Sequence, residues 1–169
     1  MSRVIAGFLA GTVATAVVSI LMVLEMTLGP ATQMGFIDAL VEVSARHLGI
    51  ERNPVIGWVV HLVIGIFVWG GLYGLINPQG SGTTLSRGLQ FGLFVWLLMM
   101  TLLMPLAGKG LFGLAEGVFF MGSALVYHLI YGVILAHQHS RMLEPVRVVP
   151  RERMKQEGSS AHWRRRIPH

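Results

Sequence analysis

The chain has 169 residues, of which 53% are hydrophobic and only 12% are charged, about half the charged share of typical soluble domains. This composition excludes an ordinary water-soluble globule and is typical of a protein solvated by lipid. Cysteine is absent, which excludes disulfide bonds, thiolate metal sites and a cysteine nucleophile.

The net charge of +5 comes from the C-terminal part of the chain. Residues 138–169 hold eight Arg or Lys and three Glu, whereas residues 1–137 hold five charges of each sign. A basic segment beside a membrane indicates a cytoplasmic location and contact with anionic lipid or a cytoplasmic partner. Nucleic acid is a less favoured partner, because no aromatic-interleaved binding motif accompanies the basic residues.

Four apolar segments predict transmembrane helices over about residues 4–28, 54–76, 88–106 and 116–137. The uncharged run from Val4 to Leu24 is long enough, at about 1.5 Å per residue, to cross a hydrocarbon layer of about 30 Å. Pro54 suits the first turn of the second helix, and Asn77-Pro78 is expected to end it. The fold class is therefore all-α, a polytopic membrane protein.

A short amphipathic helix is predicted over residues 35–48, between the first two spans. Asp38, Glu42 and Arg46 recur every fourth residue opposite an apolar face, and Gly49 is placed to end the helix. This pattern predicts a helix lying along the membrane surface. The alternative is that it only packs over the mouth of the bundle.

The predicted membrane domain covers residues 1–139, and residues 140–169 form a basic tail with too few apolar residues to fold alone. Four spans place both termini on one side, together with Arg3 and Arg87, so the positive-inside rule puts them in the cytoplasm. The basic residues expected to contact lipid or a partner are Arg141, Arg147, Arg151, Arg153, Lys155, Arg164, Arg165 and Arg166.

Matching strings suggest that the chain repeats one helical hairpin. The second span contains HLVIG at 61–65 and the fourth contains HLIYG at 128–132. The first and third spans each carry a GxxxG pair, Gly7 with Gly11 and Gly88 with Gly92. These glycines are predicted helix-packing positions. Duplication as two parallel hairpins and chance similarity both remain open.

Two intramembrane histidines, His61 and His128, are the main functional candidates, because an ionisable residue within the bilayer is costly. Small residues precede and follow each of them at a spacing of four and are expected to leave clearance for a flat macrocycle. These residues are Gly57, Gly65, Ala124 and Gly132. Two such histidines can ligate haem b axially or bind a metal.

A difference in depth weakens the case for a site shared by the two histidines, unless helix tilt absorbs it. His61 is expected about 10 Å below the outer helix end and His128 about 16 Å below it. The alternative is structural, with each histidine hydrogen-bonded to a neighbouring carbonyl, hydroxyl or tyrosine.

Methionines provide a second possible ligand set. Met22 and Met26 lie one turn apart in the first span, and Met100 and Met104 lie one turn apart in the third. Thioethers suit a soft metal such as Cu(I), and a mixed site with His61 or His128 is one interpretation. Apolar packing by these flexible side chains is the other.

The strings WLLMM at 96–100 and MPLAGKGLFG at 104–113 occur together with GW at 57–58 and the HxxYG at 128–132. In these motifs the chain resembles a family of small bacterial four-helix inner-membrane proteins catalogued as a domain of unknown function. The resemblance covers about residues 1–137. It implies the fold class and a bacterial inner-membrane location, and it implies no activity.

The predicted function is that of a non-enzymatic accessory or scaffold subunit in a membrane complex, with another membrane protein or a second copy as partner. This interpretation rests on the small-residue faces. The alternative is a haem- or metal-binding protein using His61 and His128, with a role in electron transfer. A transporter of small solutes or ions is the third interpretation.

Overall fold

The computed structural model describes residues 1–29, 34–76 and 82–143. Of these residues 86% are helical, and none of them forms a strand. Four helices are long and apolar enough to cross a membrane, which confirms the predicted all-helical fold with four candidate spans. The chain is therefore a membrane protein in contact with the lipid bilayer.

Two of the spans are continuous α-helices, and two contain a π-helical segment. The continuous ones are α1 (Arg3–Leu28) and α7 (Val118–Leu143). The second span consists of α3 (Pro54–Val63), π-helical η1 (Ile64–Trp69) and α4 (Gly70–Ile76). The third consists of α5 (Thr84–Leu98), π-helical η2 (Met99–Leu103) and α6 (Met104–Leu106), and the short 3₁₀ helix η3 (Leu111–Gly113) follows it.

Two helices extend beyond the residues that the sequence predicts. The third span starts at Thr84 rather than residue 88, because the side chain of Thr83 accepts a hydrogen bond from the Ser86 amide at 3.2 Å and caps the helix. The fourth span continues to Leu143. His139, near its end, is still buried against the bundle, so packing stabilises the helix beyond residue 137. Arg141, predicted to belong to the tail, therefore lies in the last turn of α7.

Glycines let the spans approach closely within each half of the chain. A Cβ atom on Gly70 would lie 2.7 Å from the carbonyl oxygen of Gly7, where α1 packs against α4. A Cβ atom on Gly88 would lie at the same distance from the carbonyl oxygen of Gly132, where α5 packs against α7. The glycine faces are therefore buried between helices of the same chain.

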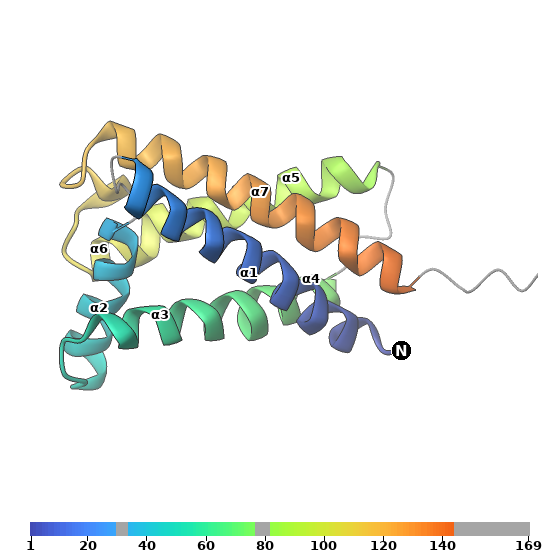
Figure 1. Cartoon of the computed structure of the whole chain (residues 1–169), viewed down its shortest axis with the longest axis horizontal. Helices are drawn as coiled ribbons and strands as arrows, with labels where there is room; N and C mark the ends of the chain where they lie inside the picture. Colours follow the sequence, from blue (N-terminus) through green and yellow to red (C-terminus); the bar gives the residue numbers. More distant parts are fainter. Residues whose placement is uncertain (30–33, 77–81, 144–169) are drawn as a thin grey trace, which may run out of the picture.

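The amphipathic helix α2 (Met34–Leu48) lies across one end of the bundle (Figure 1). Its residues Ile37 and Leu40 are buried, whereas Asp38 is exposed. Its apolar face thus packs onto the bundle mouth, and the backbone of Gly49, with φ of +68°, ends the helix. The start of α1 and the end of α7 lie at the opposite end of the bundle (Figure 1).

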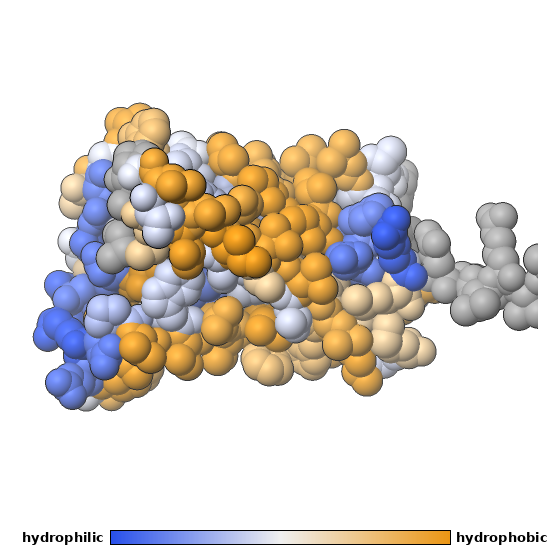
Figure 2. Space-filling view, in the orientation of Figure 1, coloured by the Kyte–Doolittle hydropathy of each residue, from blue (hydrophilic) through white to orange (hydrophobic). Residues whose placement is uncertain are grey.

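The surface is apolar along the sides and hydrophilic at the two ends (Figure 2). The described carboxylates all belong to the end that α2 covers, whereas Arg3, Arg87 and Arg141 belong to the opposite end. The carboxylates are those of Glu25, Asp38, Glu42, Glu51 and Glu116.

Candidate functional site

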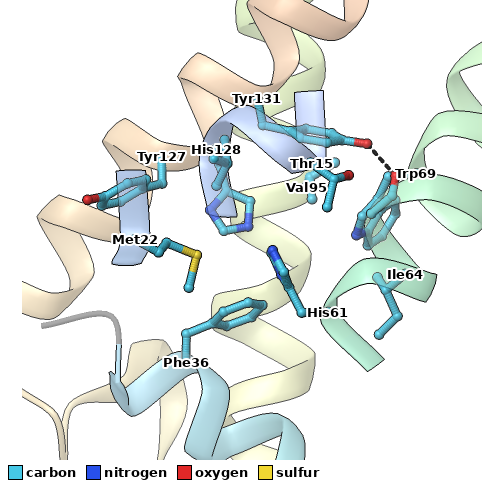
Figure 3. Close-up of a pocket in the computed structure, with 12 residues that line it drawn as sticks. Thr15, Met22, Phe36, His61, Ile64, Trp69, Val95, Tyr127, His128 and Tyr131 are labelled. Carbon is cyan, nitrogen blue, oxygen red and sulfur yellow. Dashed lines mark hydrogen bonds between the residues drawn. The ribbon is translucent and has the colours of Figure 1, made fainter. Parts of the chain in front are cut away.

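His61 of α3 and His128 of α7 line one cavity of about 60 Å³ inside the bundle. The two rings face each other across it, with a nitrogen of His61 directed toward His128 (Figure 3). The two histidines stand 7 and 10 residues after the first residues of α3 and α7, so their depths differ by only about 4.5 Å. This difference in depth is small enough for two histidine side chains to reach the same cavity.

The ring of His128 is held by its own helix. Its Nδ1 lies 2.7 Å from the carbonyl oxygen of Ala124, one turn earlier. A carbonyl oxygen can only accept, so Nδ1 carries the hydrogen. In the neutral ring Nε2 then has a free lone pair on the other side.

The ring of His61 is held by neighbours from its own helix and from two others. Its Nε2 forms a 3.1 Å hydrogen bond with the hydroxyl of Ser19 in α1. The rings of Trp58 and Phe36 meet it edge to face, with centroids 5.8 Å and 5.6 Å away. Residues of three helices, α1, α2 and α3, therefore contribute to the position of this imidazole.

Phe36 closes the cavity on the side of α2. Its ring contacts both imidazoles, with its centroid 6.4 Å from that of His128 (Figure 3). The residue belongs to the first turn of α2, which packs onto the bundle mouth. The site is thus covered by a helix that does not cross the membrane.

Polar groups also line the opposite wall of the cavity. The hydroxyl of Tyr131 donates to the carbonyl oxygen of Gly65 at 2.6 Å (Figure 3). Thr15, which is 1% exposed, has a buried hydroxyl beside Tyr131. Tyr127 lines the cavity too, and its hydroxyl donates to the carboxylate of Glu25 at 2.9 Å.

The predicted clearance is not found at three of the four small residues near the histidines. Gly57 packs against Ile37 of α2, and Gly132 packs against α5. Ala124 is fully buried in a separate apolar cluster. Only Gly65 lines the cavity, because the other three are used in helix contacts.

A b-type haem does not fit this site. The cavity has a volume of about 60 Å³, whereas sites for drug-sized ligands have volumes of about 300 Å³ or more. The ring of Phe36 also occupies the space beside both imidazoles. The two histidines therefore do not leave room for a macrocycle between them.

The methionines separate into two groups. Met22 is 1% exposed and lines the cavity with both histidines. Met100 and Met104 pack in an apolar cluster with Ala39 of α2. Met26, half-buried one turn after Met22, does not line the cavity. Within the described ranges, no group of three or more His, Asp or Glu residues is arranged to hold a metal ion.

A second hollow, of about 380 Å³, opens sideways beside the cavity between α1 and α3. The two helices separate toward the end that α2 covers (Figure 1). Ser19 and Trp58 line this groove and both contact His61.

Several residues of the site were not singled out as site residues from the sequence. Phe36, Ser19, Thr15 and Tyr131 come from three helices, and each has an ordinary packing interpretation when taken alone. The sequence did contain one signal for these residues, because Thr15 and Ser19 put hydroxyls one turn apart in an apolar span.

Two predictions lie outside the described residues. They are the tail contacts from Arg147 to Arg166 and the helix end at Asn77-Pro78.

A family model described as a family of unknown function (DUF6789) matches residues 1–147. The match covers most of the chain, so the chain belongs to this family, and the predicted resemblance to a domain-of-unknown-function family is confirmed. No curated protein and no solved structure matches the chain.

Proposed function

We propose that this member of the DUF6789 family is a non-enzymatic accessory membrane protein that holds a small ligand between His61 and His128. The observation that supports this function is the convergence of the two imidazoles, from different spans, on one cavity. Burying a polar ring among apolar helices costs free energy unless its nitrogens find partners. A ligand on the cavity side would provide partners.

The small volume of the site supports binding rather than conduction. The cavity holds about 60 Å³, enough for a few water molecules or one small ligand. Phe36 covers it toward α2, and Val95 and Tyr131 line its walls. The transporter interpretation would need a path to both ends of the bundle.

A docking role for this protein has to use surfaces other than its glycine faces. Gly7, Gly11, Gly88 and Gly92 pack against other helices of the same chain. We therefore place the partner contacts of the accessory subunit at the basic tail, which would meet anionic lipid or a cytoplasmic protein. The eight Arg and Lys of residues 138–169 support a cytoplasmic location for both termini.

Native mass spectrometry of the full chain, gently extracted from membranes, tests the ligand. The wild-type protein is expected to carry a small bound species that His61→Ala and His128→Ala each lose. His47→Ala is the matched control, because it removes an exposed imidazole at the end of α2. Loss of the species in this control as well, or a wild-type protein without any, would contradict the proposal.

A further inference from the structure

Three side chains with metal-binding atoms surround the cavity, and each comes from a different span. Met22 belongs to α1, His61 to α3 and His128 to α7. All three line the same space, and the thioether of Met22 lies on the same side of the His128 ring as Phe36 (Figure 3). One thioether and two imidazoles thus border the same cavity.

We propose that the ligand is a single Cu(I) ion bound by the thioether of Met22 and one nitrogen each of His61 and His128. This inference rests on the proposed function, since it names the ligand of the same cavity. Thioethers select soft ions, and imidazoles also bind copper. A small three-donor site suits an ion rather than an organic ligand.

The charge of the site favours a univalent ion. The three donors are neutral, and no Asp or Glu side chain of residues 1–29, 34–76 and 82–143 lines the cavity. The desolvation cost of an ion in an apolar medium rises with the square of its charge, so a divalent ion costs about four times as much as a univalent one. Zinc, magnesium and calcium sites usually supply thiolates or carboxylates to offset this cost.

The hydrogen bonding of His128 fits a metal ligand. Metal-bound histidines commonly donate their second ring N–H to a carbonyl or carboxylate, which fixes the ring and its tautomer. In this protein Nδ1 of His128 donates to the carbonyl oxygen of Ala124 at 2.7 Å, and Nε2 keeps its lone pair. Ser19 similarly orients the ring of His61 at 3.1 Å.

The surroundings would keep the ion reduced. Phe36, Val18 and Val95 line the cavity together with the ligands and make much of its wall apolar. Soft, neutral donors in this apolar pocket favour Cu(I) over Cu(II), which prefers nitrogen and oxygen ligands in a tetragonal arrangement.

Anaerobic titration of the purified full chain with Cu(I), in competition with a chromophoric Cu(I) chelator, tests this inference. We expect one ion per chain. Met22→Leu should weaken binding at least tenfold, and His61→Ala and His128→Ala should weaken it at least as much. X-ray absorption of the copper-loaded protein should show one sulfur and two nitrogen neighbours.

Met26→Leu is the matched control, because this methionine lies one turn further along α1 and does not line the cavity. Its Cu(I) affinity should stay within about twofold of the wild type. Met22→Leu conserves volume and apolar character, so the fold is expected to survive, and circular dichroism verifies this. Equal affinity in Met22→Leu and wild type, or no sulfur neighbour, would overturn the inference.

The two proposals fail in different ways. A bound species other than copper that is lost in His61→Ala and His128→Ala would uphold the ligand site and overturn the Cu(I) assignment. Absence of any bound species, with no Cu(I) binding on titration, would overturn both. Cu(I) that remains bound in the presence of equimolar Zn(II) supports the soft-ion assignment, and its displacement contradicts it.

Discussion

Nδ1 of His128 lies 2.7 Å from the carbonyl oxygen of Ala124, one turn earlier on the same helix. This contact sets which nitrogen of the ring can bind anything in the cavity, because the hydrogen must be on Nδ1. The helix thereby presents Nε2 as an acceptor. This hydrogen bond explains how a histidine in an apolar span can have a bonding partner at one ring nitrogen and keep the other nitrogen free to bind a ligand.

The tautomer of His128 is directly measurable. In protein labelled with ¹⁵N at histidine, we expect the Nδ1 resonance of His128 to have the shift of a protonated nitrogen and Nε2 that of an unprotonated one. The resonance is assigned by its absence in His128→Gln. A protonated Nε2 in the ligand-free protein would contradict the prediction.

Substitution of Gly92 tests the close approach of α5 and α7. A Cβ atom there would overlap the carbonyl oxygen of His128, so Gly92→Ala should destabilise the protein by about 1–3 kcal/mol through overpacking. Gly122→Ala is the control, because its Cβ would meet nothing within 4 Å. This change should be neutral or stabilise by up to about 1 kcal/mol. Unfolding in detergent measures both, and equal effects would refute the packing argument.

Tyr131→Phe removes the hydroxyl that donates to the carbonyl oxygen of Gly65 at 2.6 Å. Gly65 lies in the π-helical segment η1, so the bond ties α7 to the second span where the helix is widened. A loss of about 0.5–1.5 kcal/mol in unfolding free energy is expected. An unchanged stability would show that the hydroxyl is not needed to hold this segment.

An ion cluster at the end of α2 should make that end sensitive to acid. The hydrogen bond from Arg52 at 2.8 Å, followed by that from Arg46 at 3.0 Å, lowers the pKa of Glu42 from 4.5 to about 2. A lowered pKa means that the stabilisation is complete above pH 4.5 and is lost as the pH falls toward 2. Because these side chains are solvent-exposed, the effect on the whole protein should be small.

Hydrogen exchange of residues 34–52 measures this effect as a function of pH. After correction for the intrinsic exchange rate, protection should fall between pH 4.5 and 2 in the wild type. Glu42→Gln should show the lower protection throughout, without this pH dependence. Arg52→Gln should also lower protection at neutral pH. A wild-type profile that is flat below pH 4.5 would contradict the prediction.

The absence of cysteine in the chain allows a clean test of orientation. Glu51→Cys places a thiol at the end covered by α2, and His137→Cys places one near the opposite end. In right-side-out vesicles, an impermeant maleimide should modify only the cysteine at position 51, and permeabilisation should expose the other. The reverse pattern would place the termini outside.

The sequence predicts the membrane fold because lipid imposes a local requirement. A span needs about 20 consecutive apolar residues, and this property is present in each segment regardless of its neighbours. Prediction of exact helix ends was weaker. The cap at Thr83 and the packing around His139 lengthen two helices beyond their hydropathic segments.

The sequence also names His61, His128 and Met22 as candidates, because ionisable and soft side chains in apolar spans are conspicuous. It does not show that they share a cavity, because helix tilt, which decides whether their depths match, cannot be read from the sequence. Their meeting depends on contacts between α1, α3 and α7, which are far apart in the chain.

The sequence alone thus determined the four-span, all-helical membrane protein and the residue types available for binding. Only the tertiary structure decided which of those residues meet. In the folded chain the glycines form helix contacts, and Phe36 of α2 lies over the two imidazoles. Met22 lies apart from Met100 and Met104. The physical reason is that lipid solvation acts on each helix separately, whereas a site depends on how helices pack against one another.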